Sequence, residues 1–237
     1  MTHFLHGIFL FSLTTAICAE RPAAPPVNLE IEFQIVALPQ AIARPLVKDL
    51  RDKAKAEAAH LELERLVTEK KARLAGWIAT SGVSGQMTYA ESIEEYRYPT
   101  EFTPPAVQFV PNYSSDKPVV PPPKVDVSMF APAPADFEMR QLGVRLEVEP
   151  VVSADGRHIK TGVVPQHTVL TEMNKTTIER GDLGVKVTVE QPVFQSLKCN
   201  QVLTLDNGRP ALLGVFKLPK SDEVEIFILR IDVKKPD

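Results

Sequence analysis

Histidine is the residue in this sequence with the widest chemical scope, because imidazole binds metals and exchanges protons near neutral pH. The chain has five: His3, His6, His60, His158 and His167. No pair has the spacing of a helical or finger-type metal motif. His158 and His167 could meet across strands, but the sequence supplies no third ligand. We interpret both as solvated strand histidines and predict no metal site.

Other catalytic patterns are also missing. The stretch SGVSG, residues 81–85, differs from a nucleophile elbow because Val83 stands where the motif has serine. No phosphate-binding loop or dinucleotide fingerprint occurs. Turn chemistry accounts for Asp155, Asp206 and Asn207. The sequence therefore predicts no catalytic or cofactor-binding residue, and we predict that the protein is not an enzyme.

The two cysteines differ in context. Cys18 lies in the N-terminal apolar segment described below, so Cys199 is the one left after cleavage of that segment. A lone cysteine forms no internal disulfide. An intermolecular bridge or a reactive thiol is one interpretation. A small, buried apolar residue is favoured, because free cysteine is commonly buried.

Residues 1–19, MTHFLHGIFLFSLTTAICA, contain no Asp, Glu, Lys or Arg and end in small residues after an apolar run. This pattern predicts a secretory signal peptide cleaved after Ala19, although the usual basic residues are replaced by histidines. A buried N-terminal helix is the alternative. The net charge of −3 and the pI near 6.0 give no electrostatic reason to expect a nucleic-acid partner.

The spacing of apolar residues changes twice in the first half of the chain. Alternation in residues 27–38, VNLEIEFQIVAL, predicts a strand with one buried face. From Pro45 to about Ala75, apolar residues recur at helical spacing, and Gly76 suits the end of a helix. We predict one amphipathic helix there, lying on a sheet, with a coiled-coil arm as the alternative. Residues 77–103 return to β character. Their tyrosines are expected to pack or line a surface, and ligand binding is the alternative.

Ten of the 21 prolines lie between Pro99 and Pro134. Such a segment cannot donate to a β ladder and is expected to be extended. We interpret it as a surface crossing between two halves of a β domain. A polyproline ligand for a partner is the alternative.

The last hundred residues are rich in β pattern. Residues 142–160, LGVRLEVEPVVSADGRHIK, predict a hairpin around Asp155-Gly156, and Asn207-Gly208 predicts a second one. The segment VEIFILRIDV, residues 224–233, predicts a strand buried on both faces. We expect 144–148 and 185–189 to hold the core.

The order of these segments resembles the β domain of bacterial secretins, the type II and type III secretion system protein family that forms outer-membrane gates. The family's Gly-Val-x-Leu-x-Val-x-Pro strand is matched by Gly143, Val144, Leu146, Val148 and Pro150. Its later strand pair is matched by Gly208, Leu213 and Gly214, with Val215 where a second glycine is usual. Residues 27–38 are similar to the family's opening strand.

The residues and the resemblance together predict an α+β protein, mainly an antiparallel secretin-like domain with one long amphipathic helix. Residues 1–19 are assigned to the signal peptide and 20–103 to the first half of the domain. A Pro-rich crossing at 104–135 leads to the second half at 136–237.

The resemblance implies a non-catalytic structural or assembly component of the bacterial cell envelope, related to secretion or pilus machinery. We expect export to the periplasm or outer membrane, and protein partners that include further copies of the chain. Membrane association stays open. The alternative is a monomeric periplasmic binding or adhesion module with the same fold.

Overall fold

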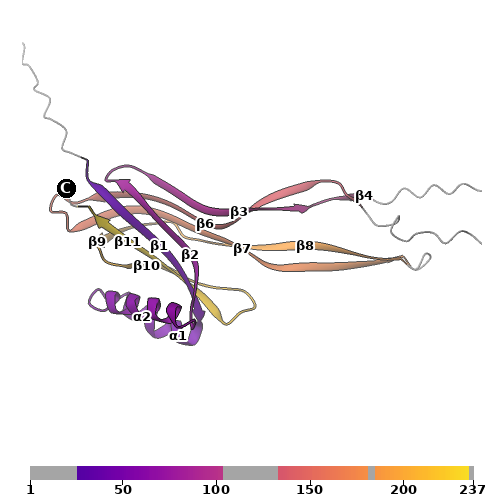
Figure 1. Ribbon diagram of the computed structural model, residues 1–237, viewed down its shortest axis with the longest axis horizontal. Helices are drawn as coiled ribbons and strands as arrows, with labels where there is room; N and C mark the ends of the chain where they lie inside the picture. Colours follow the sequence, from indigo (N-terminus) through magenta and orange to yellow (C-terminus); the bar gives the residue numbers. More distant parts are fainter. Residues whose placement is uncertain (1–25, 104–132, 181–184, 235–237) are drawn as a thin grey trace, which may run out of the picture.

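The computed structural model describes residues 26–103, 133–180 and 185–234, which form two antiparallel sheets and two helices (Figure 1). We call the first sheet the helix-covered sheet. In spatial order it contains β10 (Ala211–Lys217), β11 (Glu223–Val233), β1 (Asn28–Pro39) and β2 (Arg73–Val83). We call the second the long-strand sheet. It contains β3 (Thr88–Pro99), β6 (Phe137–Val152), β7 (His158–Arg180) and β8 (Val185–Lys198), with β9 (Gln201–Asp206) also paired to β7. A short pair, β4 (Phe102–Thr103) and β5 (Ala133–Pro134), continues from β3 and β6.

The core lies between the two sheets. Alternate residues of β1 face inward, as its pattern predicted, and Phe33 packs edge-on against Phe227 of β11 with ring centroids 5.5 Å apart. The prediction that β11 is buried on both faces is confirmed: Phe227 faces the long-strand sheet, while Ile226 and Ile228 face the helices. Each sheet contains strands from both halves of the chain.

The prediction of one long helix is wrong. The chain forms α1 (Gln40–Leu50) and α2 (Ala56–Thr68), and Gly76 lies inside β2. The Asp52 carboxylate accepts a hydrogen bond from the backbone N–H of Ala54 at 3.0 Å, and the Asp52 carbonyl accepts two more as α2 begins. Asp52 thus stabilises the turn from which α2 begins.

The break has a packing reason. A single helix of thirty residues would be about 45 Å long, more than a strand of twelve residues can cover. Instead, each of the two short helices packs its apolar side against the same face of the sheet. Leu50, Leu63 and Leu66 pack there against Leu38 and Ile226. The prediction that helix lies on sheet is therefore confirmed, but with two helices.

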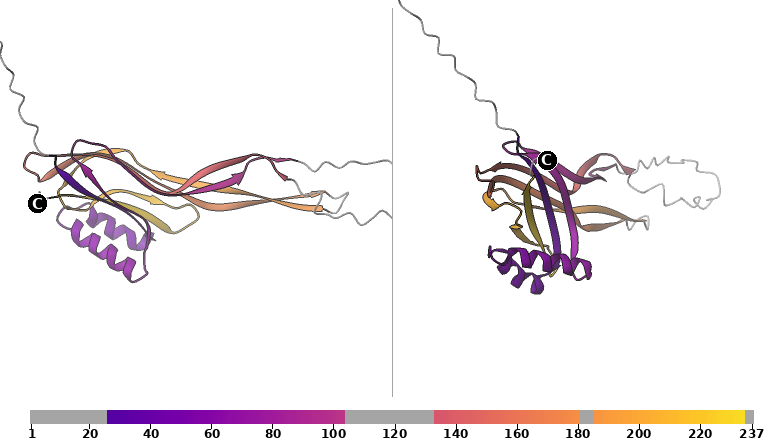
Figure 2. Two further views of the ribbon diagram at one scale, coloured as in Figure 1. Left: turned by 45° about the horizontal axis from the view of Figure 1, so that its top comes forward. Right: turned by 60° about the vertical axis from the view of Figure 1, so that its left-hand side comes forward.

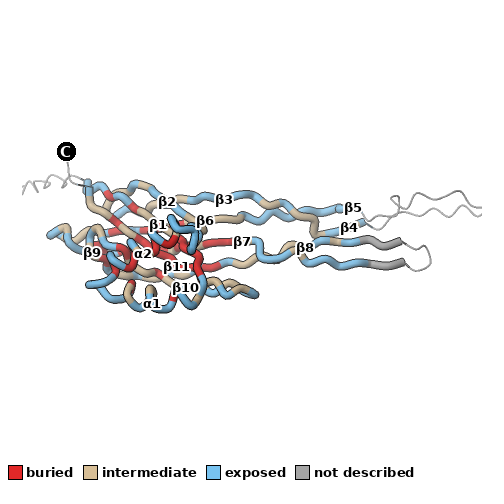
Figure 3. Tube along the Cα trace, turned by 60° about the horizontal axis from the view of Figure 1, so that its bottom comes forward, coloured by how far each residue is buried: buried red, intermediate tan, exposed pale blue. Residues whose placement is uncertain are grey.

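The Asp155-Gly156 hairpin is confirmed and proves much longer than the sequence pattern. β6 and β7 pair from Val152↔Ile159 as far as Gly143↔Thr168, and then they separate. Beyond that point β3 continues with β6, and β7 continues with β8, as two separate two-stranded ribbons. We call residues 93–99 with 137–143 the first ribbon, and 169–180 with 185–195 the second ribbon. Both extend away from the core, and their exposure contrasts with the buried body (Figures 2 and 3).

The second predicted hairpin, at Asn207-Gly208, is wrong. β9 pairs with β7, and β10 pairs with β11, so this turn carries the chain from one sheet to the other. Asn207 fixes the crossing: its side-chain amide donates to the Gly156 carbonyl at 3.0 Å and accepts from the Val233 N–H at 2.9 Å. Gly208 has φ +75°, which an L side chain rarely adopts.

The expected core strands are confirmed in part. Val144 and Val148 are buried between the sheets. Val185 and Val187 lie outside the described side chains, and Val189 is half-buried in the second ribbon. Near its other end, β8 contributes Leu197 to the core.

Candidate assembly site

The protein has two opposite flanks, each formed by edges of both sheets. On the first flank β2 is the edge of the helix-covered sheet and β3 is the edge of the long-strand sheet, joined to it by a tight turn. On the second flank β10 is one edge, and β8 with β9 lies beside it. The Gln201 side chain of β9 donates to the Leu213 carbonyl of β10, which ties the two sheets together there.

The ribbons carry the longest unpaired edges among the described strands. β3 and β7 run outward from the core, and β6 and β8 return. Beyond Gly143 and Thr168, β6 and β7 have no ladder between them, so each ribbon has two edges that no other described strand pairs with. Soluble proteins normally shorten, cover or break such edges, because free N–H and C=O groups pair with other strands.

An aromatic cluster holds the two ribbons against each other. Tyr96 and Tyr98 of β3 contact Phe194 of β8, with ring centroids 6.0 and 5.2 Å apart, and the Tyr96 hydroxyl lies 3.8 Å from the Met173 sulfur. β3 and β8 are the opposite edges of the long-strand sheet, so this contact requires the ribbons to lie face to face. Tyr96 and Tyr98 therefore pack, whereas Tyr89 of β3 is 49% exposed at the surface.

The Tyr98 hydroxyl has a second role at the ribbon surface. It donates a hydrogen bond to the Glu138 carboxylate of β6 at 2.9 Å. This bond, with partial desolvation, raises the pKa of Tyr98 above its usual value. The hydroxyl therefore remains a donor and pins β3 to β6 within the first ribbon.

A buried polar pair lies where the ribbons leave the core. His167 Nδ1 of β7 lies 2.7 Å from Glu225 Oε2 of β11, and these residues are 5% and 1% exposed. The interpretation of His167 as a solvated strand histidine is therefore wrong. The pair joins the two sheets next to Thr168, the last buried residue of β7 before its ribbon begins.

The other described histidines lie apart from this pair. His60 is on α2, as expected, and is buried with its Nε2 3.2 Å from Gln34 Oε1. His158 stands at the start of the same strand as His167, not across from it, and its Nδ1 lies 3.1 Å from Asp206. Among the residues that the structure describes, no three His, Cys, Asp or Glu side chains form a group suited to a metal ion.

The Asp206 carboxylate is contacted by side chains from two elements. Lys53, in the link between the helices, lies 3.3 Å from its carboxylate, and His158 approaches the same oxygen. Hydrogen bonding to Lys53, aided by His158, holds the pKa of Asp206 below its usual value. Asp206 therefore does more than the turn role predicted for it, because it ties the helix link to the end of β9.

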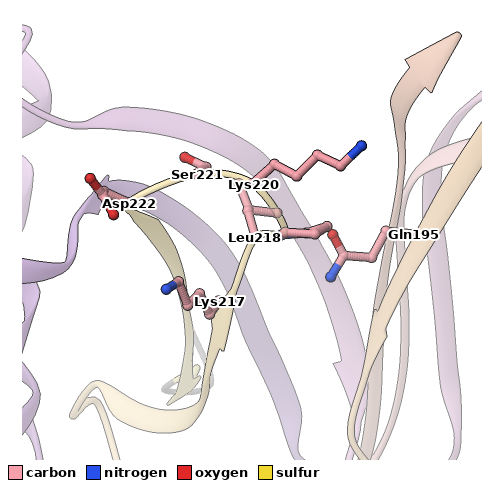
Figure 4. Close-up of a pocket in the computed structure, with 7 residues that line it drawn as sticks. Gln195, Lys217, Leu218, Lys220, Ser221 and Asp222 are labelled. Atoms are coloured by element: carbon pink, nitrogen blue, oxygen red, sulfur yellow. The ribbon is translucent and has the colours of Figure 1, made fainter.

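A pocket of about 510 Å³ opens on the second flank between β8 and the β10–β11 turn (Figure 4). Gln195 of β8 borders it, and its Oε1 is buried without a hydrogen-bond partner in the described structure. Lys217, Lys220 and Asp222 border it from the turn. Cys199 lies near the base of β8, half-buried against the core, which agrees with its interpretation as a small packing residue.

Neither described helix is long and apolar enough to span a membrane. The predicted signal peptide, residues 1–19, lies outside the described residues, as do residues 104–132 of the Pro-rich segment. The ends of that segment are paired, Phe102 with Pro134 and Thr103 with Ala133.

Comparison with solved structures finds secretins. The Salmonella type III secretion injectisome secretin InvG matches over 90% of this chain and 66% of its own, with 9% identity and a TM-score of 0.40. The type II secretin GspD of enteropathogenic Escherichia coli matches over 90% and 71%, with 8% identity and a TM-score of 0.41. The Vibrio cholerae type IV competence pilus secretin PilQ matches over 90% and 62%, with 12% identity and a TM-score of 0.39.

The chain thus spans about two thirds of the length of these secretins. Neither a protein-family model nor a curated protein matches the sequence. The resemblance to secretins predicted from the strand motifs is confirmed, at low identity and as a likeness of general arrangement.

Proposed function

We propose that this chain is a non-catalytic structural component of the bacterial cell envelope, related to secretion or pilus machinery, whose copies join edge to edge. The observation that carries the proposal is the pair of ribbons with unpaired edges. An extended two-stranded ribbon is marginally stable alone in water. A neighbouring copy would supply the missing ladder partners.

Strand direction supports this mode of assembly. Each ribbon contains one outgoing and one returning strand, so its two edges run in opposite directions. If copies are related by rotation about an axis along the ribbons, every junction between like ribbons pairs an outgoing strand with a returning one. Each junction is then antiparallel, and no copy has to be inverted. A head-to-tail contact of this kind generates a ring when the rotation closes.

The remaining parts of the proposal follow from the sequence. Residues 1–19 would direct export, and the mature chain would act in the periplasm or outer membrane with other envelope proteins as partners. The divisions at 20–103, 104–135 and 136–237 stay predictions.

The test measures the mass of the mature chain, residues 20–237, for the wild type and for variants in which proline blocks the β3 edge. Light scattering with and without detergent is expected to show a discrete multimer. Glu94 and Glu95 are adjacent exposed residues of the β3 edge, so the N–H of one points toward β6 and the N–H of the other points outward. Proline at the outward position removes an edge donor and spares the ribbon ladder.

We therefore expect one of Glu94→Pro and Glu95→Pro to keep the unfolding midpoint of the wild type and lose the multimer. The other breaks the β3–β6 ladder and lowers the midpoint. A monomer at every concentration in both conditions would refute the proposal and favour the monomeric binding module. A multimer that survives both substitutions would show that the β3 edge takes no part.

A further inference from the structure

A groove of about 480 Å³ lies on the first flank, between α2 and the outer face of the helix-covered sheet. Its lining contains two large apolar side chains at the sheet edge, Leu74 and Trp77, which are 44% and 55% exposed. The wall on the helix side contains Glu64 and Val67. Large apolar groups gathered at an open strand edge are typical of an interaction surface.

The groove is held in shape by a hydrogen-bonded chain. The Trp77 indole N–H donates to Glu32 Oε1 at 2.8 Å, and the Gln34 amide donates to the same oxygen at 2.9 Å. Gln34 Oε1 in turn lies 3.2 Å from Nε2 of the buried His60. Because these contacts fix the exposed indole, little conformational freedom would be lost when a partner covers it. Tryptophan in such a position is a common energetic centre of protein interfaces.

The second flank complements the groove in charge. α1 lies over β10 and β11 and exposes Arg44 and Lys48, whereas α2 exposes Glu64 at the groove, which Glu32 of β1 also lines. The edges also match. Successive strands from β10 to β2 are antiparallel, so β2 and β10 run in opposite directions. A second copy placed by simple rotation therefore offers an antiparallel β10 to β2 and sets its basic α1 beside the acidic α2.

We propose that the α2–β2 groove is the docking site for the α1–β10 side of a second copy of this chain. The inference rests on the proposed edge-to-edge assembly and adds a contact distinct from the ribbons. β2 and β10 extend the helix-covered sheet between copies, Trp77 is buried, and Glu64 meets Arg44 and Lys48 of the neighbouring copy.

The first test removes the indole. Trp77→Ala is expected to raise the dissociation constant between copies by about tenfold or more, measured by sedimentation of the mature chain. Val151→Ala is the matched control, because Val151 is 49% exposed in β6, an inner strand of the long-strand sheet. Unfolding midpoints of both variants establish that folding is retained.

The second test uses charge. Glu64→Lys alone and the Arg44→Glu, Lys48→Glu pair alone are each expected to weaken assembly. An equimolar mixture of the two proteins is expected to restore it, because alternating copies place a swapped pair at one junction and a native pair at the next. Loss without rescue in the mixture would argue against contact between α1 and α2.

The outcomes separate this inference from the proposed function. A wild-type multimer that Trp77→Ala and Glu64→Lys leave intact would overturn the groove and leave ribbon assembly standing. A multimer that the groove substitutions disrupt but that tolerates proline at both β3 positions would support docking at the groove. It would also exclude pairing between copies through the β3 edge. A wild-type protein that stays monomeric would overturn both.

Discussion

The buried pair between His167 and Glu225 permits a quantitative test of how the ribbons are anchored. His167→Leu leaves the Glu225 carboxylate, 1% exposed, without its partner 2.7 Å away. Removing one member of a buried pair typically costs about 3–5 kcal/mol. For a chain of this size each kcal/mol lowers the melting temperature by about 2–4 °C, so we expect a fall of about 6–20 °C.

The second single variant and the double variant complete a cycle. Glu225→Met leaves a buried imidazole unpaired, at a cost of about 1–3 kcal/mol. The double variant removes both polar groups and fills the space with apolar atoms, so its cost is expected to be below about 2 kcal/mol. The two single effects should therefore exceed the double effect by about 2 kcal/mol or more.

The free energies of unfolding come from urea titrations, monitored by both far-UV circular dichroism and Trp77 fluorescence. Coincident transitions are needed before the values are combined. Additive effects of the two substitutions would contradict the pairing of His167 with Glu225. A loss below about 1 kcal/mol for His167→Leu would show that the carboxylate is not isolated in the core.

Three further predictions concern the ribbons and the turns. Phe194→Ala removes the ring between the ribbons, so amide exchange in 93–99 should accelerate while exchange in β11 stays unchanged; equal acceleration in both would place Phe194 in the global core. Gly208→Ala should cost about 1–2 kcal/mol, because φ is +75° and a Cβ there would lie 2.9 Å from the Asp232 carboxylate; unchanged urea unfolding would contradict this strain. The depressed pKa of Asp206 gives stability above the unfolded value of about 4, lost as pH falls through the folded value. Asp206→Asn should therefore be less stable than the wild type at neutral pH, with the gap closing in acid; a gap independent of pH would exclude the ion pair.

Strand positions follow well from the sequence, because alternation is local information. β1, β11 and the β6–β7 hairpin were all predictable from side-chain pattern and turn residues. Strand partners were not. The sequence of the Asn207-Gly208 turn is the same whether its flanking strands pair with each other or enter different sheets. The hydrogen bonds that send them into different sheets join Asn207 to Gly156 and Val233, which are distant in the sequence.

The buried pair of His167 and Glu225 could be predicted in part from the sequence. Glu225 is the one acid in the first seven residues of VEIFILRIDV, and His167 continues the inward series of Ile159 and Val163 in β7. Each pattern indicates a buried polar residue. Their meeting depends on which strands of the two sheets face each other, and no local pattern carries that information.

The groove at Trp77 was missed for a different reason. An exposed tryptophan in a strand with weak alternation has the same sequence signal as a packed one, and the helix break at Asp52 that sets α2 beside it was itself unpredicted. The ribbons were missed likewise, since the predicted hairpin pattern covered only residues 142–160.

The number of strands links these features. The helix-covered sheet has four strands and each ribbon has two. An antiparallel sheet with an even number of strands has edges that run in opposite directions, so identical copies related by rotation continue it with antiparallel pairing. An odd number would place parallel strands at every junction or require alternate copies to be inverted. The helix-covered sheet and each ribbon both meet the even condition. One head-to-tail contact would therefore satisfy the body and the ribbons together, and the rotation per copy would decide whether the assembly closes.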